Sequence, residues 1–347
     1  MLLLSIDLNL IAKLILLIIF FIIFNQICLK NKIFLSNTTI SNHKNFISSK
    51  NLIPISGGFF LLFSNMILQK DFFLDPYNYF YFSIFCIGIY ADFSKNFKPI
   101  LRILTQILII GILLNIFNIL IKDVKIPIFN SFLNIDFLAL IFTVFCVLVL
   151  INGANLIDGV NLSAIGYFLL ILFIIYTLSI RNNFYVDIEF IKIQIYLLIV
   201  IIIFNFFNRS YIGDSGIYLL SLITSVVIIK FINNNNSISP YFAVLLLWYP
   251  CFENLFSIIR RLLSKRPTSE PDNRHLHHLI YSFLNKKKIS LSYCNNITGI
   301  IILLFNIPIF YFGYKFYNKT QSLILITLLA IFLYLLFYFI LRKKIKI

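Results

Sequence analysis

Long apolar stretches separated by short polar segments run through most of this chain of 347 residues. A membrane-crossing helix needs about 20 mostly apolar residues, and by that criterion the pattern predicts about eleven such helices. They lie near residues 8–29, 52–69, 77–91, 99–121, 132–151, 160–180, 190–207, 214–232, 238–259, 296–314 and 321–341. The pattern therefore predicts an all-α polytopic integral membrane protein, which we interpret as one transmembrane domain over residues 1–347 with a polar loop at about 260–295 that is a candidate functional segment.

The amino-acid composition supports this interpretation but identifies no candidate site residues. Hydrophobic residues make up 60% of the chain, charged residues 12%, and the mean hydropathy is +0.95, which excludes a soluble domain built around one core. The five cysteines lie in or beside apolar stretches without a CxxC pair, so we interpret them as packing residues. The first apolar stretch has no basic segment before it and no small-residue cleavage site, so we interpret it as a span and not a signal peptide.

Basic residues gather in alternate polar segments, and this alternation predicts the orientation. The richer segments hold Lys30, Lys32, Lys44 and Lys50; Lys95, Lys98 and Arg102; Arg209; the loop from Arg260 to Lys288; and the tail from Arg342 to Lys346. The positive-inside rule places these segments in the cytoplasm, with the N-terminus outside and the C-terminus inside. The net charge of +16 is then a topology signal, and attraction to anionic lipid headgroups is compatible with it.

Three of the predicted cytoplasmic segments each carry an aspartate where an apolar stretch begins or ends: Asp92, Asp158 and Asp214. A carboxylate near the bilayer centre costs about 2.5–3.5 kcal/mol and needs a partner or water, so each is a candidate site residue. Asn152, Asn155 and Asp158 recur every three residues, so a helix would place them on one polar face. The alternative for that segment is a polar turn that caps the next helix, and the alternative for Asp92 is an interfacial charge.

The polar loop gathers Arg260 and Arg261 with His275, His277 and His278, which are three of the four histidines in the chain. No cysteine and few carboxylates accompany them, so the cluster favours phosphate binding over zinc. A basic patch that only orients the protein is the alternative. No nucleic-acid partner is expected, because the loop has no aromatic interleaving and no nucleic-acid-binding module. Carboxylates that hold a divalent ion beside Arg and His donors are what phosphoryl transfer requires.

Five segments in this order resemble the polyprenyl-phosphate N-acetylhexosamine-1-phosphate transferases of glycosyltransferase family 4, which include phospho-N-acetylmuramoyl-pentapeptide transferase. They are PISGG at 54–58, GIYADFSK at 88–95, NGANLIDGVN at 152–161, YIGDSG at 211–216 and PDNRHLHH at 271–278. The resemblance covers roughly residues 40–285. It implies a bacterial inner-membrane enzyme that transfers a sugar 1-phosphate from a UDP-N-acetylhexosamine to undecaprenyl phosphate and releases UMP. The implied product starts a cell-envelope glycan such as O-antigen or capsule, and the resemblance leaves a homodimer open.

Carried over position by position, the resemblance implies three groups of site residues. The catalytic residues are Asp92, Asp158, His275, His277 and His278; the substrate-binding residues are Asn152, Asn155, Tyr211, Arg260 and Arg261; the metal ligands are Asp214 and Asp92. The implied metal is Mg²⁺, with Mn²⁺ as the alternative. Tyr211 stands where family members place an aromatic ring that stacks on uracil.

The chain also departs from the family pattern. Ala91-Asp92 stands where the family usually has two adjacent aspartates, and Asn161-Leu162 stands where it usually has Asp-Gly. The first departure motivates one alternative, a catalytically inactive homologue that only binds polyprenyl phosphate. The other alternative is a transporter of lipid-linked sugars, for which midplane charges and an internal repeat are expected. The HLHH form and the eleventh predicted span resemble the glycan-initiating branch of the family.

Overall fold

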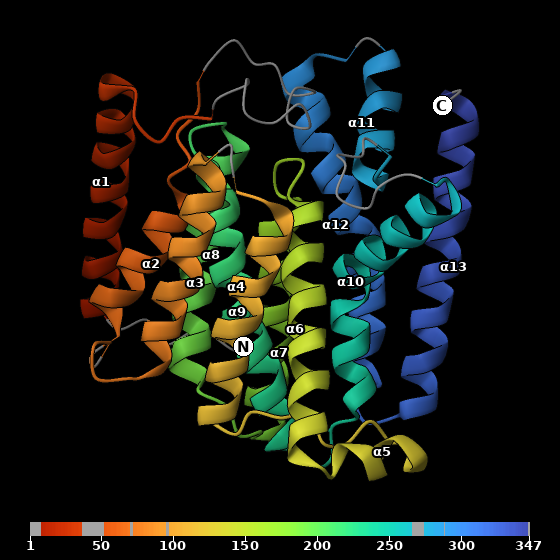
Figure 1. Cartoon of the computed structure of the whole chain (residues 1–347). Helices are drawn as coiled ribbons and strands as arrows, with labels where there is room; N and C mark the ends of the chain where they lie inside the picture. The colour runs from red at the N-terminus through yellow and green to blue at the C-terminus, as the bar shows by residue number, and fades with distance from the viewer. Residues whose placement is uncertain are drawn as a thin grey trace.

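The computed structural model describes residues 8–36, 52–69, 72–94, 97–265, 274–287 and 289–345. These residues form thirteen helices and two isolated β-bridges. The helices are α1 (Leu8–Asn31), α2 (Gly57–Leu68), α3 (Tyr77–Phe93), α4 (Pro99–Ile116), α5 (Pro127–Leu133), α6 (Asp136–Ile157), α7 (Ser163–Asn182), α8 (Ile188–Phe206), α9 (Gly213–Asn233), α10 (Pro240–Leu263), α11 (Leu276–Lys286), α12 (Leu291–Lys315) and α13 (Thr320–Ile345). Most of them stand upright in one bundle, with α1 and α13 at opposite edges (Figure 1).

Nine of the described helices are long and apolar enough to cross a membrane: α1, α4, α6, α7, α8, α9, α10, α12 and α13. The helices α2 and α3, with 12 and 17 residues, are shorter than that criterion requires. Every predicted apolar range contains a helix, so the all-helical, polytopic architecture is confirmed. The apolar-run criterion does not predict α5 and α11, which have 7 and 11 residues.

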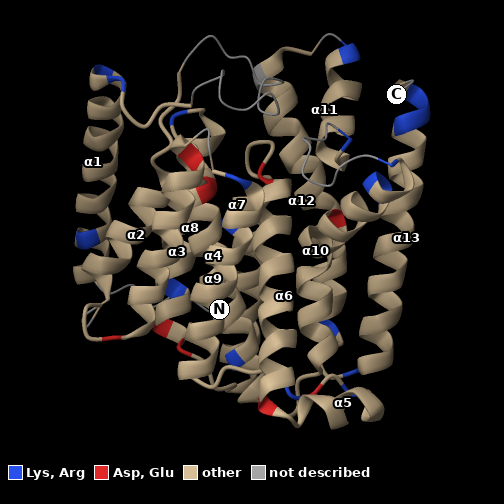
Figure 2. Ribbon diagram, in the orientation of Figure 1, with Lys and Arg blue, Asp and Glu red and all other residues tan. Residues whose placement is uncertain are grey.

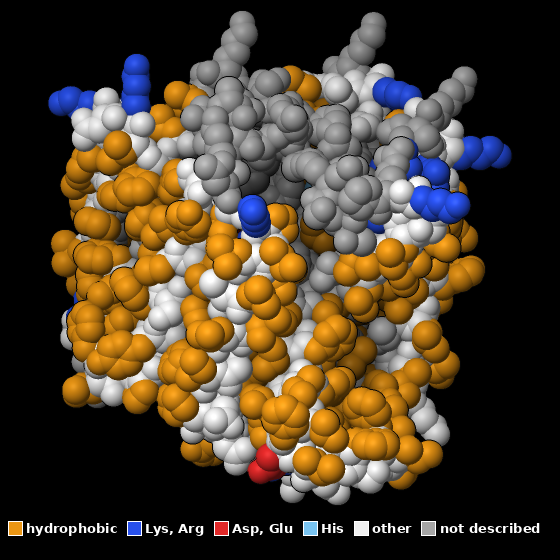
Figure 3. Space-filling model, viewed as in Figure 1, with side chains coloured by type: hydrophobic (Ala, Val, Ile, Leu, Met, Phe, Trp, Pro, Cys, Tyr) orange, Lys and Arg blue, Asp and Glu red, His pale blue; other side chains and the backbone are white. Residues whose placement is uncertain are grey.

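The face of the bundle seen in Figure 3 is mostly apolar, and exposed large hydrophobic residues lie along most of the described helices, whereas many described Lys and Arg residues lie at the upper end (Figures 2 and 3). An apolar belt is what a bilayer requires, because lipid offers no partner for exposed polar groups. Successive helices alternate in direction, so α3, α6 and α10 end at the upper end, where α2, α7 and α9 begin (Figure 1). The three aspartates of interest therefore share one end of the molecule.

Helix α9 is the centre of the bundle, and small residues let its neighbours reach its backbone. Most of α9 is buried, and it packs against α2, α3 and α6. A Cβ added to Gly58 of α2 would lie 2.6 Å from the Gly216 nitrogen, and one added to Gly88 of α3 would lie 2.2 Å from the Ser215 Cα atom. Small residues at such crossings are typical of membrane helices, where close backbone packing replaces the hydrophobic effect.

Gly88→Ala is expected to lower the stability of the fold by about 1–3 kcal/mol, because α3 and α9 must separate to admit the new methyl group. Gly111→Ala is the matched control: it also lies within a helix, but its added Cβ would meet its nearest neighbour, Val144, at 3.9 Å. The thermal unfolding midpoint in detergent should fall by several degrees for the first variant and stay constant or rise for the second. Equal unfolding midpoints for Gly88→Ala and Gly111→Ala would contradict the close α3–α9 crossing.

Helix α10 is bent, and its second half turns toward α13 (Figure 1); Pro250 lies inside this helix. Proline lacks the N–H that would bond to the preceding turn, and its ring displaces the carbonyl there, so a bend at this position is expected. The bent half carries Glu253, Ser257 and Arg260 beneath the start of α11. The proline thereby brings α10, α11 and α13 together at the polar end of the bundle.

Candidate active site

The segments at 54–58 and 211–216 pair with each other at the start of α2 and α9. The Tyr211 N–H donates to the Pro54 carbonyl (2.8 Å), and the Gly57 N–H donates back to the Tyr211 carbonyl (2.9 Å). Ile55 and Tyr211 form a parallel β-bridge. The backbone bonds fix the first turns of the two helices relative to each other, so two of the five family-like segments form one structural unit.

Asp92, at the last turn of α3, holds the first turn of α9. Its Oδ1 accepts the Asp214 N–H (2.8 Å), and its Oδ2 accepts the Ser215 N–H (3.1 Å). The first N–H groups of a helix have no partner within the helix, and a negative charge is favourable beside them. Gly213 permits the approach, because its φ of +72° suits glycine and a Cβ there would lie 2.8 Å from the Asp92 Oδ2.

Asp214 is half-buried in the first turn of α9. Its Oδ2 accepts the Tyr218 hydroxyl (3.3 Å), and within the part of the chain that the structure describes its Oδ1 has no protein partner. The described residues contain no group of three or more His, Cys, Asp or Glu side chains that could hold a metal ion by themselves. A single carboxylate with a free oxygen suits Mg²⁺, which usually takes one or two protein carboxylates and completes its shell with substrate phosphates and water.

The last two turns of α6 carry Asn152 and Asn155, and Asp158 follows as the C-terminal capping residue. All three side chains are half-buried, and their spacing puts them on one side of the helix end. The Asn152 amide donates to the Leu148 carbonyl one turn earlier (2.8 Å). The next helix, α7, begins after Leu162 without a side-chain cap, so capping does not explain the polar residues of this segment.

Asn161 is buried in a network of asparagines that joins three parts of the chain. Its side-chain amide donates to the Oδ1 atoms of Asn208 and Asn296 (both 2.8 Å), and its backbone N–H donates to the Oδ1 of Asn295 (2.9 Å). Asn208 lies between α8 and α9, and the other two partners lie in α12. Asn161 therefore holds the α6–α7 loop in place, and it differs in role from the half-buried residues before it.

The three histidines pack together at the start of α11, against the loop that follows α6. His275, His277 and His278 are all buried, and the ring centroids of His277 and His278 lie 4.1 Å apart. A Cβ added to Gly159 would lie 2.1 Å from the His277 Nε2, so this ring rests on the residue beside Asp158. The third and fifth family-like segments thus meet, as the first and fourth do.

Burial lowers the pKa of His277 well below its usual value, and the neighbouring His278 and His275 rings lower it further. The ring is therefore neutral at pH 7. Neither ring nitrogen of His277 has a hydrogen-bond partner among the described residues, although buried polar groups are normally satisfied. A neutral imidazole donates one N–H and accepts at its other nitrogen, so His277 suits a hydrogen bond better than a charge interaction.

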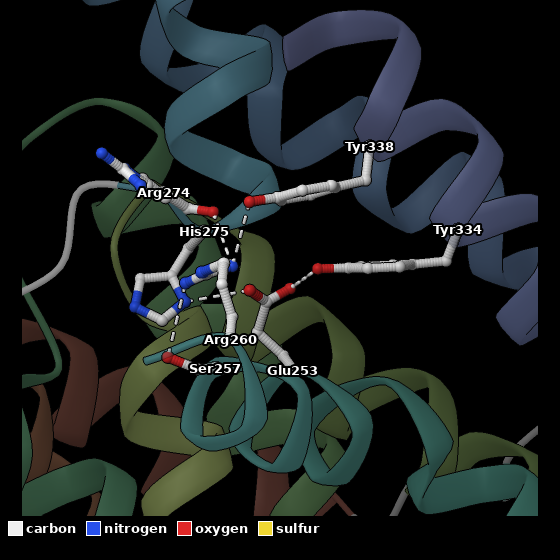
Figure 4. A network of polar contacts seen from close by, with 7 residues as sticks. All are labelled: Glu253, Ser257, Arg260, Arg274, His275, Tyr334 and Tyr338. Atoms are coloured by element: carbon white, nitrogen blue, oxygen red, sulfur yellow. Dashed lines mark hydrogen bonds and ion pairs between the residues drawn. The ribbon is translucent and has the colours of Figure 1, made fainter. Parts of the chain in front are cut away.

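Arg260 is engaged by protein groups. Its guanidinium donates to the Arg274 carbonyl (3.0 Å) and to the Tyr338 hydroxyl (3.1 Å) (Figure 4). It also lies over the Phe256 ring. Arg261, the next residue, is half-buried. The structure therefore places Arg260 where it braces the segment that precedes His275.

One buried carboxylate at this site has no counterpart in the sequence-based expectations. Glu253 of α10 is fully buried, and its Oε1 lies 2.9 Å from the His275 Nδ1 (Figure 4). A charged residue within a span was the available signal, since such residues are rare and usually functional. Its partners are 22 and 81 positions away in the sequence, so the spacing of residues could not reveal the contact.

The predicted site residues thus form two contact groups at the same end of the bundle. One group joins Asp92 to the α9 turn that carries Asp214, with Tyr211 just before it; the other joins the end of α6 to the histidines of α11. Residues 77–232, from the start of α3 almost to the end of α9, match the model of glycosyl transferase family 4. The match covers slightly less than half of the chain, so this part of the chain is similar to glycosyl transferase family 4.

Two relatives are similar to parts of this chain. It is 25% identical over 212 residues to the "Probable undecaprenyl-phosphate N-acetylglucosaminyl 1-phosphate transferase" of Bacillus subtilis, covering 58% of this chain and 56% of that protein. It is 30% identical over 97 residues to the "Undecaprenyl-phosphate alpha-N-acetylglucosaminyl 1-phosphate transferase" of Thermotoga maritima, covering 26% of this chain and 32% of that protein. The similarity thus spans about half of the first relative and a third of the second.

Proposed function

We propose that this chain is a member of glycosyl transferase family 4 that transfers an N-acetylhexosamine 1-phosphate from a UDP-sugar to undecaprenyl phosphate, releases UMP and so initiates a cell-envelope glycan. The observation that carries the proposal is the Asp92–Asp214 unit, in which one carboxylate orients the helix turn that presents the other. The family match and the printed names of the two relatives support the reaction class. The histidine cluster at the same end of the bundle supplies donors for phosphate oxygens.

In the proposed reaction an oxygen of the lipid phosphate attacks the phosphorus that bears the sugar. The bond from that phosphorus to the bridging oxygen breaks, and the electron pair leaves with UMP. A phosphate monoester has a second pKa of about 6, so at pH 7 the attacking group is mostly a dianion and needs little help from a base. The protein therefore acts mainly by positioning and by stabilising charge, which dominate catalysis of phosphoryl transfer.

Each predicted site residue has a role in this proposal. Asp214 is the metal ligand, and a bound Mg²⁺ would neutralise the charge of the diphosphate oxygens. Asp92 keeps the α9 turn in place and adds negative charge beside the ion. The half-buried Asn152, Asn155 and Asp158 line the nucleotide-sugar pocket, and Tyr211 stacks on uracil.

The donors that face the diphosphate form a separate part of the proposal. The rings of His277 and His278 donate hydrogen bonds to phosphate oxygens, the ring of His275 faces the diphosphate with its Nε2, and the guanidinium of Arg261 adds positive charge. Arg260 acts indirectly, because its guanidinium bonds the backbone carbonyl of Arg274, the residue before His275.

The reaction is tested with purified protein, radiolabelled UDP-N-acetylglucosamine, undecaprenyl phosphate and Mg²⁺. Release of UMP together with labelled lipid is the expected result, and a panel of UDP-hexosamines then identifies the sugar. An inactive lipid-binding homologue and a transporter both predict that no UMP appears.

We further propose that α2 and α3 also cross the bacterial inner membrane, so that one transferase domain spans it eleven times with the C-terminus in the cytoplasm. A reporter that is active only outside the cytoplasm should be silent after Lys288 or Ile347 and active near Asn234. The physical reason is the excess of basic residues near the first two positions. The reverse pattern would place the aspartates on the side without nucleotide sugars, and the proposed reaction would be wrong.

A further inference from the structure

Glu253 is held at both carboxylate oxygens by groups from other parts of the chain. Its Oε1 lies 2.9 Å from the Nδ1 of His275, the residue that precedes α11, and its Oε2 accepts the Tyr334 hydroxyl from α13 (Figure 4). The carboxylate and the imidazole are both buried, with side-chain exposures of 0% and 4%. Three helices at the polar end therefore meet at one carboxylate.

Stability alone does not account for this carboxylate. Taking a charge out of water costs several kcal/mol, and replacing a buried polar pair by apolar residues is often neutral or stabilising. The surroundings would suit an apolar side chain, because the rings of Trp248, Phe252 and Phe256 pack on Tyr334 at centroid distances of 5.1–6.3 Å. Packing among aromatic rings therefore does not explain why this position holds a carboxylate. Its contact with the His275 ring does.

The carboxylate fixes the tautomer of His275. An ionised carboxylate only accepts hydrogen bonds, so the proton between Glu253 and His275 belongs to Nδ1. The Nε2 of the ring then faces away from Glu253 (Figure 4). Histidines that bind metals or transfer protons are commonly oriented by a partner at the other ring nitrogen.

A second layer of contacts holds the backbone of the same segment. The Arg260 guanidinium bonds the carbonyl of Arg274, the residue before His275, and the hydroxyl of Tyr338. Tyr334 and Tyr338 are one turn apart on α13, so one face of this helix supports both the His275 ring and its backbone.

We propose that Glu253 is a positioning residue that fixes the tautomer and the ring orientation of His275, and that Tyr334 makes α13 part of the support of the active site. This inference rests on the proposed function, because it takes the Nε2 of His275 to face the diphosphate. The extended C-terminal helix then contributes to catalysis without touching a substrate.

The first test compares Glu253→Gln, Tyr334→Phe and a matched control, Tyr167→Phe. Tyr167 is also a buried tyrosine whose hydroxyl bonds α10, but it bonds the Leu246 carbonyl (2.8 Å). Glu253→Gln should lower kcat about 100-fold with a KM for the UDP-sugar within threefold of the parent, because an orienting group affects the reacting geometry more than binding. Tyr334→Phe should lower kcat about tenfold, and Tyr167→Phe should change it less than twofold.

The second test observes the imidazoles directly. The chain has four histidines, so ¹⁵N-histidine labelling gives few signals in spectra of the protein in lipid bilayers, and His275→Gln assigns the signal of interest. The parent should show a protonated Nδ1 and a bare Nε2 at His275. Glu253→Gln should alter this pattern, since the amide of glutamine can also donate to Nδ1, and Tyr167→Phe should leave it unchanged.

The inference is overturned by an unchanged His275 signal in Glu253→Gln, or by a changed signal with parental kcat. A kcat loss that Tyr167→Phe shares would also overturn it, because general loosening of α10 would then explain the effect. Should the parent lack transferase activity, the proposed function fails, while the ¹⁵N comparison still decides whether Glu253 fixes His275.

Discussion

Asp214→Asn is expected to lower kcat at least a thousandfold while the protein stays folded and inserted in the membrane. The bonds that hold the first turn of α9 use the backbone N–H groups of Asp214 and Ser215, so the substitution leaves them intact. The amide oxygen can still accept the Tyr218 hydroxyl. The variant therefore loses only the negative charge, which an amide cannot replace as a ligand of Mg²⁺.

Turnover and the thermal unfolding midpoint, measured on the same preparation, check this expectation. Tyr218→Phe is the companion variant, because it removes the hydrogen bond to the Asp214 Oδ2 and keeps the charge. Its loss should stay within about tenfold, the usual scale of one hydrogen bond. Activity of Asp214→Asn within tenfold of the parent would exclude the metal-ligand role.

Asp92→Ala should lower kcat at least a hundredfold and, unlike Asp214→Asn, should also lower stability. The substitution leaves two N–H groups of α9 without their acceptor, and each such loss costs about 1–3 kcal/mol. Asp92→Asn keeps one acceptor oxygen, so its stability should lie between those of the parent and Asp92→Ala. The pair of measurements separates a residue that acts only on substrate from one that also orients α9.

The neighbouring position provides the control for this expectation. Ala91→Asp restores the second aspartate of the family pattern, and we expect it to be tolerated with at most a small change in pH optimum. Loss of activity in Asp92→Ala without loss of stability would contradict the orienting role. If Ala91→Asp instead creates activity in an inert parent, the chain is a lipid-binding homologue.

The apolar pattern predicted the helices well because a bilayer imposes one strong requirement, about 20 apolar residues per crossing. That rule reports nothing about shorter elements. The seven residues of α5 are too few to register, and α11 lies in a charged loop. Leu276, Leu279, Ile280 and Phe283 do have helical spacing, so hydrophobic periodicity was the signal for α11.

The residues of the candidate site could partly be predicted from the sequence because they fall in short, recognisable segments. The contacts between these residues could not be predicted. Asn161 continues the spacing of Asn152, Asn155 and Asp158, yet it is buried among other asparagines, because the chain leaves the helix at Asp158. Glu253 stands alone in an apolar stretch, and the bend of α10 that directs it toward α13 becomes visible only in three dimensions.

The bond between Asp92 and the start of α9 also bears on how the protein is made. The two residues joined, Asp92 and Asp214, are 122 positions apart, which at about 5–20 residues per second corresponds to about 6–24 s of synthesis. For that interval α3 exists without the amides that its carboxylate will bind. In the proposed topology α3 crosses the membrane, and Asp92 lies in its last turn and not at its middle. Water at the membrane surface would then solvate Asp92 meanwhile, and the nascent helix would avoid the cost of about 2.5–3.5 kcal/mol for a carboxylate at the bilayer centre. The proposed topology therefore allows α3 to insert before the partner of Asp92 has been synthesised.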